Sequence, residues 1–265
     1  MPHQILTSAK SAMLKEYKDH VEERLQQGIP PLPLNAEQVA DLVELLKSPP
    51  AGEEEFILDL IKNRTPAGVD PAAYVKAAFL TALAKGETSS PLIDKKLATE
   101  LLGTMLGGYN VESLIKLLKD EEVGAIAADG LSKTLLMFNA KHEVIELAAE
   151  NENAKRVVES WSNGEWFTSK SKLPEVIKAI VFRVDGEINT DDFSPAQDAP
   201  SRPDIPLHAL AMLKKNMEDP IGTIEKLKES GLPVVFVGDV VGTGSSRKSA
   251  TNSLLWHIGC LLYTS

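Results

Sequence analysis

The sequence is poor in cysteine, has no long apolar run and carries no excess of positive charge. Its one cysteine, Cys260, cannot form an intramolecular disulfide, and alone it cannot build a zinc site or hold an iron–sulfur cluster. No apolar run approaches the roughly 20 residues that a membrane-spanning helix needs. The first residues also lack the apolar stretch of a secretory signal. We therefore expect a cytoplasmic protein with no membrane partner.

The charge balance is acidic. The chain has 38 acidic and 28 basic residues and a net charge of −10. This balance argues against a chain-wide nucleic-acid surface, which would be basic, although a local basic patch can still exist. Hydrophobic residues make up 43% of the 265 positions, which is enough for a sizeable core in one large domain or two ordinary ones.

Residues 11 to about 167 predict one short amphipathic helix after another, the first at Met13–Gln27, separated by brief turns that contain proline or glycine. The start signals are local. Asn35, with Gln38 three residues later, is close to a capping box, and Asp70 is an N-cap residue followed by Pro71 in the first turn. Because each short helix buries little by itself, the helices must stack. An irregular α-solenoid is the expected form, and a compact helical bundle is the alternative.

The pattern changes near residue 168. Lys178–Val184 is rich in β-branched residues and predicts a strand, and Val234–Val237 predicts a short buried strand. Helices are expected at Leu207–Lys215 and at Lys248–Ile258. Strands that alternate with helices indicate an α/β domain after the helical one.

A glycine-rich segment, Gly238–Ser253 (GDVVGTGSSRKSATNS), lies between the second predicted strand and the last helix. Glycines let the backbone approach a ligand closely, and a helix N-terminus offers free N–H groups and a positive dipole end. Ser245 and Ser246 add hydroxyl groups, and Arg247 adds a planar fork that fits a carboxylate. The segment therefore predicts an anion site with a hydroxyl at its centre.

The known phosphate-binding motifs do not fit this segment. A Walker A loop ends in Gly-Lys-Ser/Thr, whereas this loop has Gly-Ser-Ser-Arg. A dinucleotide fingerprint needs a third glycine at the position that Arg247 occupies. A carboxylate is therefore the better chemical match for the anion.

Gly-x-Gly-Ser-Ser-Arg after a strand resembles the signature of the swivelling domain in the aconitase superfamily, and Gly238–Ser253 is similar to the bacterial aconitase B branch in particular. Asn189–Met212 (NTDDFSPAQDAPSRPDIPLHALAM) and, in the helical part, PPAGEEEF and LLGTMLGGYN resemble the same branch. The resemblance covers roughly residues 13–256. It implies a multidomain α + α/β protein, in which a HEAT-like helical solenoid precedes a truncated swivelling β/β/α domain. The expected divisions are an N-terminal extension at 1–12, the helical domain at 13–168 and the swivelling domain at 169–265, whose tail 257–265 does not resemble the family.

The resemblance also implies roles for single residues. Ser245 matches the catalytic base, which would take a proton from the carbon beside a carboxylate as water leaves from the neighbouring carbon. Ser246 and Arg247, together with Ser245, match substrate-binding positions, and Arg202 in the SRPD motif matches another substrate-binding arginine. A serine hydroxyl is a poor base unless nearby positive charge and N–H groups stabilise its alkoxide. The implied activity is that of a lyase of the tricarboxylic acid cycle.

That lyase interconverts citrate and isocitrate through cis-aconitate, with 2-methylisocitrate as a further candidate substrate. The resemblance implies a 4Fe–4S cluster on three cysteines, and those ligands are absent from this chain, so we expect the chain alone to be inactive. It further implies a homodimer through the helical domain and binding of mRNA in the cluster-free form. The helical domain itself shows no RNA motif and is not basic.

Two other functions are alternatives. The small subunit of isopropylmalate dehydratase has the same swivelling domain, but the long helical region argues against it. A non-catalytic solenoid that binds proteins or mRNA is the second.

Simpler structural roles are also open for single residues. Ser245–Arg247 could be a turn with an ordinary serine N-cap, and Arg202 a surface arginine. Asp191 and Asp192 more simply cap a turn than form a metal or acid–base pair, and a structural role is favoured for His208.

Overall fold

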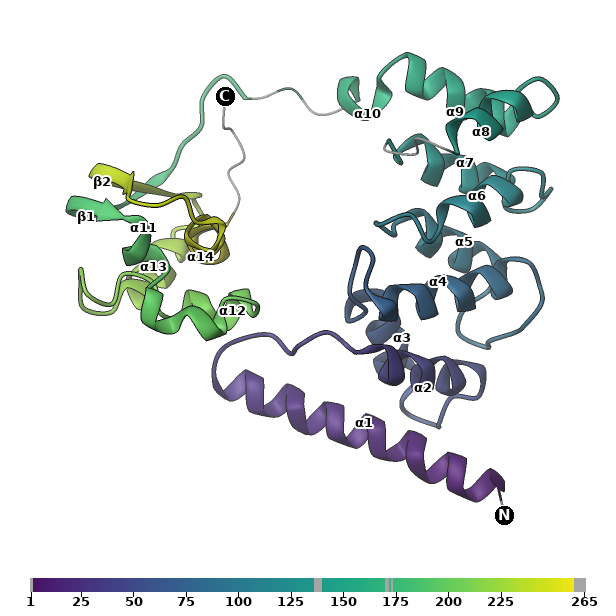
Figure 1. The fold of residues 1–265 in the computed structure, drawn as a ribbon, viewed down its shortest axis with the longest axis horizontal. Helices are drawn as coiled ribbons and strands as arrows, with labels where there is room; N and C mark the ends of the chain where they lie inside the picture. The colour runs from purple at the N-terminus through teal and green to yellow at the C-terminus, as the bar shows by residue number, and fades with distance from the viewer. Residues whose placement is uncertain (1, 136–139, 170–171, 173, 260–265) are drawn as a thin grey trace. The chain divides into compact units, whose positions relative to one another are not determined.

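A computed structural model describes residues 2–135, 140–169, 172 and 174–259 of the chain (Figure 1). The chain divides into two compact units, one formed by residues 1–22 and 32–171 and the other by residues 23–31 and 172–265. Each unit has a hydrophobic cluster of its own. Cys260 lies outside the described residues. Among the described helices, none combines the length and the apolar character that crossing a bilayer would require.

In its described residues the first unit consists of helices and the turns and loops that connect them. Its helices are α1 (Pro2–Gln26, whose last turn belongs to the second unit), α2 (Ala36–Lys47), α3 (Glu54–Asn63), α4 (Pro71–Ala84), α5 (Lys95–Gly103), α6 (Val111–Leu117), α7 (Gly124–Ser132), α8 (Lys141–Leu147), α9 (Glu152–Ser162) and α10 (Glu165–Thr168). Between residues 13 and 161 the described part contains no strand, as the sequence predicts.

Local capping signals explain where several of these helices begin. Asn35 accepts a hydrogen bond from the Gln38 backbone N–H, and the Gln38 side chain accepts one from the Asn35 N–H, both at 2.9 Å. The Asp70 carboxylate accepts from the Ala72 N–H at 2.8 Å, with proline in the first turn. One boundary differs from expectation: α1 begins at Pro2 and not at Met13, because no residue after Pro2 interrupts the helix and proline is tolerated at its start.

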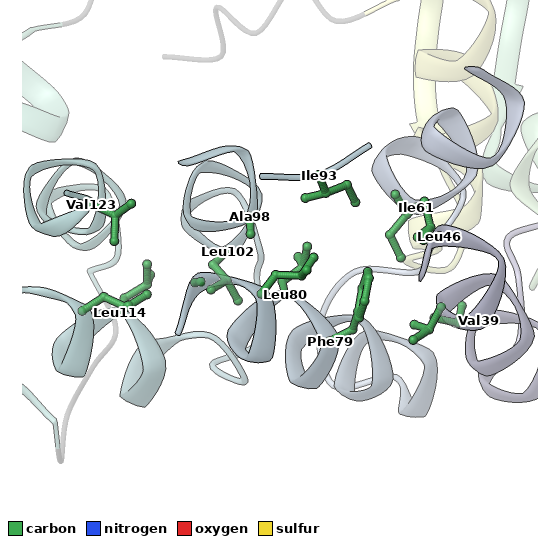
Figure 2. Packing of buried hydrophobic residues seen from close by; sticks show 14 of the residues in the cluster. Val39, Leu46, Ile61, Phe79, Leu80, Ile93, Ala98, Leu102, Leu114 and Val123 are labelled. Carbon is green, nitrogen blue, oxygen red and sulfur yellow. The ribbon is translucent and has the colours of Figure 1, made fainter. Parts of the chain in front are cut away.

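Packing in the first unit connects helices that are one or two positions apart along the chain. Helix α2 packs against α4, α4 against α5, α5 against α7, and α7 against α9. Figure 2 shows buried side chains such as Leu80, Leu102 and Leu114 filling the space between neighbouring helices. Helices α5 and α7 approach closely at Gly103 and Gly130, since a Cβ atom added to Gly130 would lie 2.8 Å from the Gly103 Cα.

The second unit is a small α/β structure. Its elements are β1 (Ile180–Asn189), α11 (Thr190–Phe193), the 3-10 helix η1 (Ala196–Ser201), α12 (Ile205–Ala209), α13 (Pro220–Lys228), β2 (Val234–Thr243) and α14 (Lys248–Ile258). The two strands pair in parallel, with Phe182 opposite Phe236. Phe193 packs edge-on against Phe236 with ring centroids 5.1 Å apart. The chain is therefore a helical unit joined to a partial α/β unit.

Tertiary pairing moves three predicted boundaries in the second unit. Strand β2 continues beyond Val237 to Thr243, because the glycine-rich segment pairs with the end of β1. Strand β1 likewise runs on to Asn189. The helix expected at Leu207–Lys215 ends at Ala209. Beyond it the Leu213 N–H donates to the Asp192 carbonyl at 2.7 Å, and Leu213 itself has a positive φ of 59°.

Candidate carboxylate-binding site

The start of α14 presents two serines and an open helix end. Strand β2 stops at Thr243, and Ser245 and Ser246 are exposed in the segment that leads to α14. The residue at the N-cap position is Arg247, in extended backbone geometry, and no side chain among the described residues caps the helix. The ordinary serine N-cap is therefore wrong. The first N–H groups of α14 have no side-chain cap from Arg247, and free N–H groups at a helix N-terminus favour an anion.

Helix α11 holds this segment in place. The Asn189 side chain accepts from the N–H groups of Asp191 and Asp192 at 2.7 and 3.1 Å, and the Asp192 carboxylate accepts from the Asn189 N–H at 2.7 Å. The Thr190 hydroxyl then donates to the Ser245 carbonyl at 2.8 Å. Asp192 thus caps the turn, as expected. A Cβ atom on Gly244, whose φ is 91°, would lie 3.3 Å from the Thr190 Oγ1, so glycine permits the close approach.

Arg247 already holds a carboxylate. Its Nη1 forms an ion pair with the Asp191 Oδ1 and also donates to the Ser194 carbonyl at 3.1 Å. Only 21% of the Arg247 side chain is exposed, whereas the Asp191 side chain is 54% exposed. Asp191 is thus an ion-pair partner and not a turn cap, a role that the sequence did not reveal. Because part of the Arg247 side chain is exposed, a carboxylate from solvent can reach it.

Arg202 follows η1 directly and is only half-buried. Its Nε is buried and has no hydrogen-bond partner among the described residues. A buried guanidinium N–H without an acceptor is costly, so this atom favours binding of an anionic acceptor. The elements that carry the two arginines belong to one packed layer, since η1 packs against α12 and α12 packs against α14.

A buried ion pair fixes the turn that carries Arg202. Arg24, at the end of α1 and within the second unit, is 7% exposed. Its Nη1 and Nη2 lie 2.6 and 3.0 Å from the two carboxylate oxygens of Asp204, and its Nε donates to the Pro30 carbonyl at 2.8 Å. Asp204 also accepts from the Leu207 N–H at the start of α12. No sequence pattern indicates this pair, whose members are 180 positions apart.

These groups can bind a polycarboxylate, but they do not fit an iron–sulfur cluster. Two arginines and an uncapped helix end supply positive potential, and two exposed serines supply hydroxyl groups. Within the described ranges no cluster of three or more His, Cys, Asp or Glu side chains could hold a metal ion. An iron–sulfur cluster needs several cysteine thiolates, and the sequence contains one cysteine.

Fold and site together define a helical unit followed by a partial α/β unit, in which an uncapped helix terminus lies beside an arginine–carboxylate ion pair. Residues 16–167 match the family described as Aconitate B N-terminal domain, and residues 179–262 match the one described as Aconitate hydratase 2 N-terminus. Because the first match covers more than half of the 265 residues, the chain belongs to the aconitase B family. That family implies a 4Fe–4S cluster. The second match reaches residue 262 and so extends past Trp256, the residue at which the resemblance is expected to end.

Relatives of the chain carry the same family name. Aconitate hydratase B of Pseudomonas aeruginosa is 61% identical over 258 residues, which cover 93% of this chain and 30% of the relative. The Escherichia coli protein of that name is 59% identical over 258 residues, with 93% and 30% covered. The Helicobacter pylori protein is 51% identical over 248 residues, with 93% and 29% covered. The chain thus spans about 30% of the length of these curated relatives, and the two alternative functions gain no support from them.

Proposed function

We propose that this chain supplies the carboxylate-binding and proton-transferring half of an aconitate hydratase, a lyase of the tricarboxylic acid cycle. The reaction would be the reversible conversion of citrate to isocitrate through cis-aconitate, with 2-methylisocitrate as a further candidate substrate. One observation carries the proposal: two exposed serines precede the uncapped N-terminus of α14, beside an arginine that already binds a carboxylate. The relatives named aconitate hydratase B support the reaction class.

Substrate binding would use the two arginines. Arg247 exchanges the Asp191 carboxylate for a substrate carboxylate, since Asp191 is largely exposed and can rotate into solvent. Arg202 offers its unpartnered buried Nε to a second carboxylate. The Ser246 hydroxyl, which is exposed at the same helix end, completes the binding set with Ser245.

Ser245 would act as the base. In the alkoxide form its Oγ accepts the proton from the carbon beside a carboxylate and becomes a neutral hydroxyl, the released electron pair forms the new carbon–carbon double bond, and the hydroxyl on the neighbouring carbon leaves as hydroxide. Negative charge is carried by the Ser245 alkoxide before the transfer, and it builds up on the substrate carboxylate as the neighbouring carbon loses its proton. The Arg247 guanidinium and the N–H groups of α14 stabilise that charge, and this stabilisation makes a serine usable as a base.

The cluster implied by the family finds no ligand set in the described residues. We therefore expect the chain by itself to bind tricarboxylates without hydratase turnover. We further propose that the helical part, residues 13–168, is a HEAT-like solenoid and that residues 169–265 belong to the swivelling domain. Packing between helices that are close along the chain and the parallel strand pair support this division. The homodimer, the binding of mRNA and the cytoplasmic location stay predictions.

A chimera tests the proposal. This chain replaces the matching 258 residues of the Pseudomonas aeruginosa relative, and hydration of cis-aconitate is measured for the chimera and for its Ser245→Ala variant. Loss of a general base lowers turnover by about 10²- to 10⁴-fold, and we expect the KM to change little. Ser162→Ala, an exposed serine of α9, is the matched control and should leave turnover unchanged. Turnover near that of the parent chimera in Ser245→Ala would refute the assignment of the base.

A further inference from the structure

A buried histidine joins the two segments that carry the candidate arginines. His208 lies in α12 and is 1% exposed. Its Nε2 lies 2.8 Å from the Ser194 Oγ, and its Nδ1 lies 2.8 Å from the Ser201 Oγ and 3.1 Å from the Asp198 carbonyl. Ser194 Oγ in turn lies 2.7 Å from the Ser249 Oγ, in the first turn of α14. No role in binding or proton transfer has been assigned to these four side chains.

The acceptors fix the direction of this hydrogen-bond chain. The Asp198 carbonyl can only accept a hydrogen bond, so the Nδ1 of His208, which lies 3.1 Å from it, must be the protonated ring nitrogen. The same carbonyl also accepts from the Ser201 hydroxyl at 2.7 Å. Nε2 is then an acceptor for the Ser194 hydroxyl, and Ser249 donates to Ser194. Burial lowers the pKa of His208 below its ordinary value, which keeps the imidazole neutral at pH 7 and preserves this arrangement.

The two ends of the chain lie beside the candidate binding groups. Ser201 immediately precedes Arg202, and Ser249 comes two positions after Arg247. Ser194 contributes twice, because its backbone carbonyl accepts from Arg247 Nη1 at 3.1 Å while its hydroxyl faces His208. A directional network with every member satisfied specifies one geometry, whereas a broken one leaves buried polar atoms unpaired.

We propose that His208 is a positioning residue that, through Ser194 and Ser201, holds the start of α14 and the turn of Arg202 at one fixed separation, so that both arginines can bind the same polycarboxylate. This inference rests on the proposed function, since it concerns the same substrate site. His208 touches neither the substrate nor the reacting atoms. Its effect is on the affinity of the two-arginine site.

The test measures binding of tricarballylate, a tricarboxylate that cannot be dehydrated, to this chain by calorimetry. His208→Asn keeps a donor near the Nδ1 position and has no atom that reaches Ser194. We expect its Kd to rise about tenfold, which corresponds to about 1.4 kcal/mol. Ser194→Ala, which retains the backbone carbonyl, should have the same effect, and the double variant should be no worse than either single one. His208→Gln, whose carbonyl can accept from Ser194, should recover part of the affinity.

Ile224→Val is the matched control, because it removes a methylene from the hydrophobic cluster of the second unit and should lower stability without changing the Kd. A nitrogen–proton correlation spectrum of the imidazole should show the proton of His208 on Nδ1. Unchanged affinity in His208→Asn would overturn the positioning role, and so would effects of His208→Asn and Ser194→Ala that add in the double variant. Neither result would overturn the proposed function. If the unmodified chain does not bind tricarballylate at all, the proposed function and this inference both fail.

Discussion

The buried pair of Arg24 and Asp204 yields a sharp prediction about the stability of the second unit. The Arg24 and Asp204 side chains are 8% and 15% exposed, and two short contacts join guanidinium and carboxylate. Arg24→Ala removes both contacts and the hydrogen bond to the Pro30 carbonyl, and it takes the guanidinium away from the largely buried Asp204 carboxylate. Removal of one partner from a buried pair costs about 3–5 kcal/mol, so we expect this loss of unfolding free energy in the second unit.

An exposed pair provides the comparison. Arg156 lies 2.7 Å from Asp129, with side chains 48% and 65% exposed. Solvent screens such a pair, so Arg156→Ala should cost about 0–1 kcal/mol. The joint replacement of Arg24 by Met and Asp204 by Leu should recover much of the loss, because apolar residues of similar size need no charged partner, although the helix cap on Leu207 is lost.

Urea unfolding followed by tryptophan fluorescence measures these differences. The chain has three tryptophans. For Arg24→Ala, replacement of Trp161 and Trp166 by Phe leaves Trp256, in α14, as the reporter of the second unit, and for Arg156→Ala, replacement of Trp256 by Phe leaves Trp161 and Trp166 as reporters of the first unit. Unfolding midpoints and slopes give the free energies. If Arg24→Ala costs no more than Arg156→Ala, the pair does not hold the Arg202 turn as argued.

Two further predictions concern the helical unit. Gly130→Ala places a methyl group 2.8 Å from the Gly103 Cα. The overpacking outweighs the gain in helix propensity, so we expect a loss of about 1–2 kcal/mol in urea unfolding, and a stabilised variant would contradict the close packing of α5 and α7. Lys76 is 6% exposed, and burial lowers its pKa from 10.5 to about 8. Burial of the charged lysine lowers the free energy of unfolding. This cost is complete below pH 8, where the lysine is charged in both the folded and the unfolded chain, and it is gone above pH 10.5, where the lysine is neutral in both. Lys76→Met should therefore raise stability by up to about 3 kcal/mol at pH 7. That gain should vanish as the pH rises through 10.5, and a gain independent of pH would refute the assignment to desolvation.

Local signals predicted those parts of the fold that depend on neighbouring residues. The capping box at Asn35 and the cap at Asp70 agree with the structure, because each is decided within one helical turn. The span of α14 also agrees with its prediction. The extension of β2 to Thr243 was not predictable in this way. Its pairing partners lie in β1, and glycine-rich sequence indicates a loop unless a partner strand is known.

The site was predictable only in its chemistry. Glycines, serines and arginine at a strand-to-helix junction indicated an anion site, and the structure adds that no side chain in its described part caps the helix. The Asp191 partner of Arg247 lies 56 positions away and the Asp204 partner of Arg24 lies 180 positions away. Neither spacing follows from a helical or strand period, so only the tertiary structure could reveal the two pairs.

The central claim is that the start of α14 binds a substrate carboxylate. A crystal structure of this chain with tricarballylate tests it most directly. The account predicts one carboxylate on the Arg247 guanidinium in place of Asp191, with the Ser245 and Ser246 hydroxyls within hydrogen-bonding distance and a second carboxylate on Arg202. A ligand bound elsewhere, with Arg247 still paired to Asp191 and no anion at the helix terminus, would contradict it.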